Sequence, residues 1–385
     1  MKAKKFPKWP AAVAVLAAVL ILVLFLLQKL LMPKYMSDIV EGNLVEEYYQ
    51  ETTDHEVIFV GDCEVYENFS PIEMYRDYGI TSYIRGSAQQ LAWQSYYLLE
   101  DTLRYETPKV VVFNVLALKY NEPQSEAYNR MSIDGMKWSK AKIGAIQSSM
   151  TEEENMLDYI FPILRYHSRW SELSSEDFRY MFHKDKLFHN GYYMRVDVRP
   201  AEGFPDPEIL ADYTLGSNAM SYLDKMRRLC EDNGIEFVLV KSPSLYPYWY
   251  EEWDQQIVDY AEKYDLDYFN YEKLADEIGI DYNTDTYDAG LHLNLSGAEK
   301  LSKYFGKYLT ETYDLTDYRE DPEYKQVYEE KIQFYEDMKE AQYEELEKYG
   351  EIISYEEEGT HEKNERYFCS SSNSNGTESG SLRKL

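Results

Sequence analysis

The sequence predicts an α/β protein, a three-layer α/β/α sandwich around a mostly parallel sheet. Two apolar runs, 57–60 and 110–115, of which the second is broken only by Asn114, are typical of strands buried on both faces. A further strand is expected over 79–87, with a helix, short or restarting at Pro71, before it and another over 88–105 after it. Strand, helix, strand, helix, strand within about 60 residues indicates a doubly wound sheet.

The same alternation resumes in the second half of the chain. A helix over 219–233 stops at Gly234, and an apolar strand follows at 236–240. A helix over 253–264, a short strand at 267–269 and a final helix from Ser296 to about Tyr313 complete the expected sheet domain.

The N-terminal segment predicts a membrane anchor. An apolar run from Ala11 to Leu27 is preceded by four lysines and extended by Leu30, Leu31 and Met32. Counted from Trp9, it is long enough to cross a hydrocarbon core of roughly 30 Å. A cleaved signal peptide is the alternative, but the stretch 28–34 contains no small-x-small cleavage site. The upstream lysines favour a cytoplasmic N-terminus. We therefore expect a single-pass protein of the cell membrane whose domain is extracellular.

Composition excludes some functions. The chain of 385 residues carries 70 acidic and 40 basic side chains, a net charge of −30, which would repel nucleic acid. The 39 tyrosines would suit stacking on sugars, although most are expected to be core. The three cysteines, Cys63, Cys230 and Cys369, are odd in number and lack metal-type spacing. We therefore expect neither a disulfide framework nor a metal site.

These patterns divide the chain into segments. Residues 1–8 are a cytoplasmic tail, 9–32 the transmembrane anchor and 33–54 a stalk. The sheet domain covers 55–315, with a mostly helical insertion at about 123–207 over the carboxyl edge of the sheet, where a lid would be built. Residues 316–349 form a charged amphipathic helix, and the Ser/Asn/Gly-rich tail, 350–385, is expected to be disordered. Surface or packing roles are expected for His167 and His189 in the insertion.

Two distant stretches together carry candidate chemistry. Gly61, Asp62 and Cys63 follow the first strand, where ligands and nucleophiles of open α/β sheets lie. Asp288 and His292 precede the final helix. A thiol, an imidazole and a carboxylate are the parts of a base-activated nucleophile. Cys63 would attack an acyl carbonyl, His292 would move the proton and Asp288 would orient the imidazole.

These residues, with Gly86 after the second strand and Asn114 in the third, resemble the SGNH (GDSL-type) hydrolases over residues 55–315. The run from His292 to Ala298 is similar to the membrane-anchored extracytoplasmic branch, which includes the teichoic-acid D-alanylation and alginate O-acetylation proteins. The resemblance implies a flavodoxin-like sheet and an oxyanion hole made by the Cys63 and Gly86 (or Ser87) N–H groups and the Asn114 amide. It implies an esterase or acyltransferase without a cofactor, acting on O-acyl groups of a cell-envelope polysaccharide or teichoic acid, with a membrane-bound O-acyltransferase as a partner.

The chain departs from the family pattern at several positions. Cys63 stands where the family has serine, and Asp288 precedes His292 by four residues instead of three, so Asp285 is an alternative orienting carboxylate. The family's Gly-x-Asn-Asp block is absent. Further candidates for substrate contact are Asp62, Arg85, Ser87 and Asn294, although Arg85 could instead pair with Asp62.

The alternative to an enzyme is a catalytically inactive scaffold of the same fold that binds cell-surface glycan through its tyrosines. In that reading Cys63 is a small buried residue and His292 caps a helix.

Overall fold

The centre of the domain is a parallel β-sheet. The computed structural model describes residues 9–37, 39–202 and 206–353. Within them the sheet has five strands in the order β2-β1-β3-β4-β5, and every neighbouring pair is parallel. The strands are β1 (Val57–Gly61), β2 (Ser82–Gly86), β3 (Val110–Asn114), β4 (Glu236–Lys241) and β5 (Tyr268–Asn270). This flavodoxin-like order confirms the predicted fold class.

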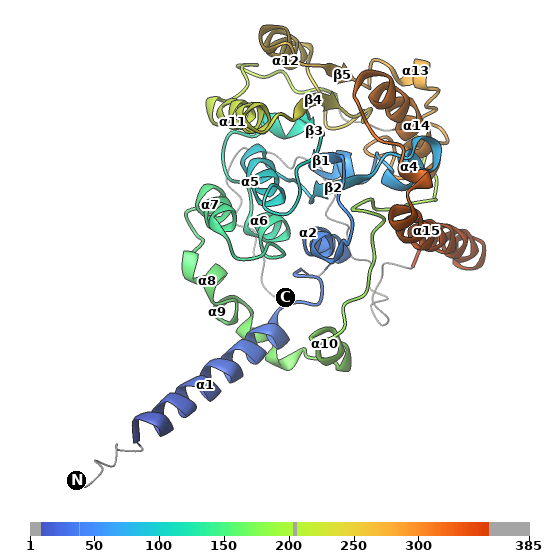
Figure 1. The fold of residues 1–385 in the computed structure, drawn as a ribbon. Helices are drawn as coiled ribbons and strands as arrows, with labels where there is room; N and C mark the ends of the chain where they lie inside the picture. The colour runs from blue at the N-terminus through green and yellow to red at the C-terminus, as the bar shows by residue number, and fades with distance from the viewer. Residues whose placement is uncertain (1–8, 38, 203–205, 354–385) are drawn as a thin grey trace.

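Helices cover both faces of the sheet (Figure 1). One face packs on α4 (Pro71–Tyr78), α13 (Ala275–Ile278) and α14 (Leu295–Thr312), and the other on α5 (Ala92–Thr102), α11 (Ser217–Asn233) and α12 (Glu251–Tyr264). Val110, Val111, Val112 and Phe113 of β3 are fully buried because alternate side chains enter the cores on opposite faces. Strand β3 therefore contributes side chains to the hydrophobic core on each face of the sheet.

The expected stalk, 33–54, is instead part of the domain. It contains η1 (Val40–Asn43), α2 (Leu44–Glu47) and η2 (Tyr48–Gln50). Leu44 and Val45 are each 1 % exposed, and the Tyr48 hydroxyl donates to Glu106 at 2.7 Å. The scattered apolar positions that suggested a solvated connector are the contacts that bury this segment.

The predicted insertion contains α6 (Glu126–Ile133), α7 (Lys140–Ser149), α8 (Met156–Ile160), α9 (Ile163–Tyr166), η4 (His167–Ser171) and α10 (Ser175–Tyr180). Helices α6, α7 and α8 share a small core with Val45 and Leu98. His167 is exposed, whereas His189 is buried against the rings of Phe334 and Tyr335. Burial lowers the pKa of His189 to about 3, so it stays neutral.

The charged C-terminal helix, α15 (Pro322–Tyr349), packs on the domain after the short η5 (Tyr318–Glu320). Tyr328 and Tyr335 are completely buried, and the ring of Tyr328 stacks on that of Tyr75 at 3.8 Å. Ile352, beyond the helix, is also buried. Most of the tail that we expect to be disordered, residues 354–385, lies outside the described residues.

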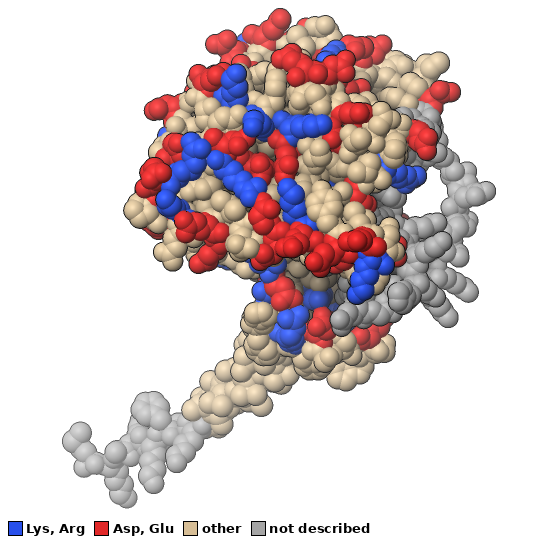
Figure 2. Space-filling model, turned by 90° about the vertical axis from the view of Figure 1, so that its right-hand side faces the viewer, with Lys and Arg blue, Asp and Glu red and all other residues tan. Residues whose placement is uncertain are grey.

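Helix α1 (Trp9–Leu31) projects from the domain (Figure 1). It is long and apolar enough to span a membrane, and the mean hydropathy of its most apolar 18 residues is 3.0. Charged side chains cover the face of the domain in Figure 2, whereas the part of α1 from Trp9 to Phe25 carries none. The predicted anchor thus exists as a helix of suitable length, in an otherwise acidic chain.

Candidate active site

The first half of the site is the sharp turn from β1 into α3 (Cys63–Tyr66). A side chain at Gly61 would place its Cβ 2.4 Å from Val65 Cγ2, so the turn requires glycine. The Asp62 carboxylate caps the helix by accepting from the Glu64 N–H at 3.3 Å. Cys63 is therefore the first residue of α3, at the carboxyl end of β1, and its side chain is fully buried.

The second half is the loop before α14, where Asp288 holds His292 at two points. One carboxylate oxygen accepts from the His292 backbone N–H at 2.8 Å, and the other lies 2.6 Å from Nδ1. This leaves Nε2 as the ring nitrogen that can exchange a proton. Asp285 is engaged elsewhere, by Lys300 at 2.5 Å and the Asp281 N–H at 2.8 Å. Asp288 is therefore the orienting carboxylate.

The two halves meet through the residues that follow Cys63. Glu67, one helical turn after Cys63, places Oε2 at 3.4 Å from His292 Nδ1. The neighbouring Asn68 side chain accepts from the Leu293 N–H at 2.7 Å. Two segments far apart in the sequence are thus joined by direct contacts, with the imidazole beside Glu67.

The two carboxylates keep His292 protonated. Burial alone would lower the pKa of His292, but the charges of Glu67 and Asp288 and the Asp288 hydrogen bond raise it to about 10. Burial, helped by the Asp288 charge and opposed by His292, raises the pKa of Glu67 to about 7. The Tyr287 hydroxyl donates to Glu67. At neutral pH the cluster therefore contains an imidazolium between two buried carboxyl groups.

A second polar network lies at the ends of β1, β3 and β4. The Asn114 amide nitrogen donates to Asp62 at 3.0 Å and to Glu64 at 2.9 Å, and Lys241 donates to the other Glu64 oxygen at 2.9 Å. Burial and the Glu64 charge raise the pKa of Asp62 to about 6. The pKa of Lys119, which faces this network, is lowered to about 8 by burial against the opposing effect of Asp62 and Glu64.

This network corrects the predicted role of Asn114. Both of its amide hydrogens are directed at carboxylates, so the side chain has no N–H left for an oxyanion. Gly86 fits its predicted position better, since it pairs in register with Gly61 at the end of the neighbouring strand.

Three candidates for substrate contact serve the fold instead. Arg85 is 1 % exposed, and it pairs with Asp101 at 3.3 Å and lies over the Tyr48 ring, not beside Asp62. The Asn294 side chain caps α14 by accepting from the Gly297 N–H and donates to two backbone carbonyl groups. The Ser87 hydroxyl is tied to Gln90 and Ser132. The fourth candidate, Asp62, caps α3 at the site itself.

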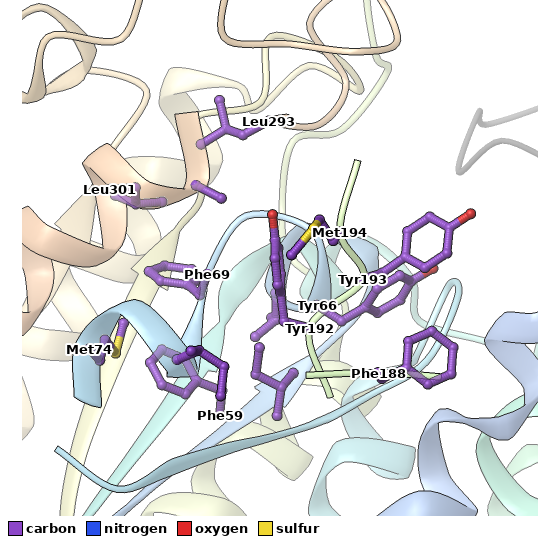
Figure 3. Packing of buried hydrophobic residues seen from close by; sticks show 14 of the residues in the cluster. Phe59, Tyr66, Phe69, Met74, Phe188, Tyr192, Tyr193, Met194, Leu293 and Leu301 are labelled. Atoms are coloured by element: carbon purple, nitrogen blue, oxygen red, sulfur yellow. The ribbon is translucent and has the colours of Figure 1, made fainter. Parts of the chain in front are cut away.

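The end of the insertion covers the site. The backbone of Tyr193 donates to the Tyr66 carbonyl group at 2.7 Å, and the Arg195 carbonyl group accepts from the Leu295 N–H at 2.6 Å. Figure 3 shows Tyr192, Tyr193 and Met194 beside Tyr66. Cys63 is 0 % and His292 4 % exposed under this cover. The end of the predicted insertion therefore lies over the carboxyl edge of the sheet, where a lid is expected.

Cys63 is disulfide-bonded in the structure. The odd number of cysteines predicts no disulfide framework, so this bond is not expected from the sequence. Cys230 is a free, buried cysteine of α11, as its position in a helical pattern indicated. Because only a thiolate is a nucleophile, the chemistry predicted for Cys63 requires the reduced chain.

Four charged residues of the site were not predicted from the sequence: Glu64, Glu67, Lys119 and Lys241. Glu67 follows Cys63 by four residues, so a helix at this point would place both on one face. Lys241 ends an apolar strand just as Asn114 does, and the same rule would have identified it. Glu64 and Lys119 carry no comparable signal.

One group of side chains could hold a metal ion. Ligand atoms of Glu67, Asp288 and His292 lie within 4.8 Å of one another. A metal would have to displace the proton that these carboxylates hold on His292, because only a neutral imidazole coordinates. The hydrogen-bonded arrangement therefore fits an oriented acid–base histidine better than a metal centre.

Comparison with known proteins adds little. No protein-family model and no curated protein matches the chain. Among solved structures, the chain is similar to a GDSL-like lipase from Bacteroides thetaiotaomicron VPI-5482, with a TM-score of 0.32 and 11 % identity, over 71 % of this chain and 100 % of that one. A TM-score this low supports no argument, so the assignment of fold rests on the strand order and connectivity described above.

Proposed function

We propose that the protein is an ester hydrolase or acyltransferase of SGNH type, with Cys63 as nucleophile, His292 as acid–base and Asp288 as the orienting carboxylate. The observation that carries the proposal is the double hold of Asp288 on His292, in a loop that contacts Glu67 and Asn68 a few residues after Cys63. A histidine held at both its backbone and Nδ1 keeps Nε2 in one direction, as a nucleophile's partner requires.

The raised pKa of His292 favours a thiol over a hydroxyl as the nucleophile. An imidazolium cannot take a proton from serine, but it stabilises a thiolate beside it. In the reduced chain the Cys63 thiolate attacks the ester carbonyl carbon. His292 Nε2–H then protonates the departing alcohol, which leaves a thioester on Cys63 and a neutral imidazole.

The second half-reaction restores the enzyme. His292 takes a proton from water, or from a hydroxyl group of an acceptor, which attacks the thioester and releases the acid or the new ester. The thiolate–imidazolium pair is then re-formed. With Asn114 engaged elsewhere, backbone N–H groups at Cys63 and Gly86 are the remaining oxyanion donors, and each such donor lowers the barrier by roughly 3 kcal/mol.

The substrate and location follow from the anchor and from the resemblance. Helix α1, preceded by lysines, supports a membrane-tethered domain on the outer side. The substrate is then an O-acylated cell-envelope polysaccharide or teichoic acid, and a membrane-bound O-acyltransferase is a natural donor of acyl groups. The cover formed by residues 189–197 has to shift before a polymer reaches Cys63.

A glycan-binding scaffold without catalysis is the second candidate. It is favoured by two observations, the complete burial of Cys63 and its disulfide bond. In this case the tyrosines near the site bind sugar, and His292 and Asp288 stabilise the loop before α14.

Alkylation of the reduced full-length protein distinguishes the two candidates. Iodoacetamide labelling of Cys63, followed by mass spectrometry, is expected to be faster than that of the buried Cys230, and His292→Gln is expected to slow it at neutral pH. The matched control is His167→Gln, at an exposed histidine whose Nδ1 lies 3.0 Å from the Leu164 carbonyl oxygen. Hydrolysis of 4-nitrophenyl acetate is expected to be lost in H292Q and kept in H167Q. Equal labelling rates for Cys63 and Cys230 in both variants would refute the proposal that the protein is an enzyme.

A further inference from the structure

The membrane-proximal end of the domain exposes a group of large apolar side chains. Six residues of the insertion, each between 48 % and 81 % exposed, form what we call the apolar collar: Leu157, Phe161, Leu164, Trp170, Phe178 and Phe182. They lie on or beside α8, α9, η4 and α10. A water-soluble surface rarely gathers so many exposed aromatic and aliphatic side chains within so short a stretch of chain.

The collar surrounds the end of α1. Helices α9 and α10 and the turn η4 all contact α1, and α9 and α10 lie on either side of its end in Figure 1. The Lys29 ammonium donates to the Met181 carbonyl group at 2.7 Å, and Arg169 donates to the Leu31 carbonyl group at 3.1 Å. The apolar surface of α1 therefore continues onto the collar.

The length of α1 sets the depth of the collar. Its exposed part runs from Trp9 to Phe25, whereas Leu30 and Leu31 are buried in the domain. At about 1.5 Å per residue, the exposed part spans about 25 Å, which is less than the roughly 30 Å of a hydrocarbon core. The last few ångströms of the core then lie at the level where the domain surrounds the helix.

The charge of the collar segment suits a lipid surface. Residues 156–186 contain five acidic and five basic side chains, in a chain whose net charge is −30. Arg169 pairs with Asp177, and Arg179 with Asp185. Aromatic side chains such as Trp170 are those that proteins place at membrane interfaces. The segment thus lacks the negative charge that would repel anionic headgroups.

We propose that the apolar collar enters the outer leaflet of the bilayer that α1 spans, to a depth of about 5–10 Å, as interfacial helices do. The proposal rests on α1 being the membrane anchor. Two regions of contact, a spanning helix and a ring around its end, hold the domain in one orientation. A single flexible tether would leave the domain free to turn.

Depth-dependent quenching tests the proposal on the full-length chain in phosphatidylcholine vesicles. Single cysteines are introduced as Phe182→Cys and Phe161→Cys in the collar, Val19→Cys in α1 and Ile209→Cys far from α1. Ile209 is 94 % exposed, and its neighbour Glu208 contacts Tyr250 at the start of α12. Each variant carries the fluorophore NBD, doxyl lipids serve as quenchers, and the unsubstituted chain gives the background from native cysteines.

We expect quenching at Phe182, Phe161 and Val19 and none at Ile209. Quenching at Val19 alone would overturn the proposal that the collar enters the bilayer and would leave the anchor intact. It is also the result expected if the collar is instead a docking surface for a membrane protein. Absence of quenching at all four positions would overturn the anchor and the collar together. The two collar positions follow different helices, Phe161 after α8 and Phe182 after α10, so one variant that fails to fold leaves the other as the test.

Discussion

Replacing Glu67 by glutamine tests whether two carboxylates set the charge of His292. Glu67 Oε2 lies 3.4 Å from His292 Nδ1, and both side chains are buried. At an effective dielectric constant of about 20, an ion pair at this distance is worth roughly 5 kcal/mol, or more than three pH units in the imidazole pKa. Asp288 remains in E67Q, so the pKa of His292 stays above its ordinary value.

We expect the pKa of His292 to fall from about 10 in the wild type by roughly one to three pH units in E67Q, since Glu67 is itself only partly ionised near neutral pH. The introduced glutamine still offers an oxygen to the Tyr287 hydroxyl, so the packing is kept. The assay is an NMR titration of the imidazole C2–H signals of histidine-labelled protein. The chain has six histidines, and H292Q identifies the signal.

The matched control is Glu73→Gln. Glu73 is a mostly buried carboxylate of α4 that pairs with Arg76 at 2.6 Å and does not contact His292. E73Q should leave the His292 midpoint unchanged. Equal midpoints in the wild type and E67Q, or a wild-type midpoint near 6.5, would refute the account of the site's electrostatics and remove the argument for a thiolate.

Two other predictions follow from the same cluster. Cys63→Ser should reduce ester hydrolysis by at least about 100-fold relative to the reduced wild type, because a protonated His292 cannot activate serine. This factor is the lower end of the range for loss of acid–base catalysis. Hydrolysis of 4-nitrophenyl acetate by C63S as fast as by the wild type would contradict this prediction. In thermal unfolding experiments, the stability of the wild type should fall relative to that of E67Q as the pH rises from about 5 to 8. In this range the folded state holds a proton on Glu67, whereas in the unfolded chain, where the pKa of glutamate is 4.5, that proton is lost. A pKa raised from 4.5 to about 7 corresponds to roughly 3 kcal/mol at most, and a difference that is constant across this pH range would refute the buried, protonated carboxyl.

Local patterns in the sequence determined the fold class, the apolar N-terminal helix and the two loops of the candidate site. The apolar strands, Gly61 and the position of Asp288 and His292 before a helix each depend on neighbours within one or two turns of the chain, and such neighbours can be read directly from a sequence. A continuous apolar run reports burial on both faces, so the central strands were predicted nearly to the residue.

Only the tertiary structure decided which polar groups meet. Glu67 reaches His292, Asn114 is taken by Asp62 and Glu64, and Arg85 turns to Asp101, because the strand order brings together segments that are distant in the chain. The segment 33–54 and one face of α15 pack on the domain for the same reason, since their apolar side chains fill gaps that other segments create. Periodicity reports whether a side chain is buried, but the identity of its partner depends on the packing of the whole chain.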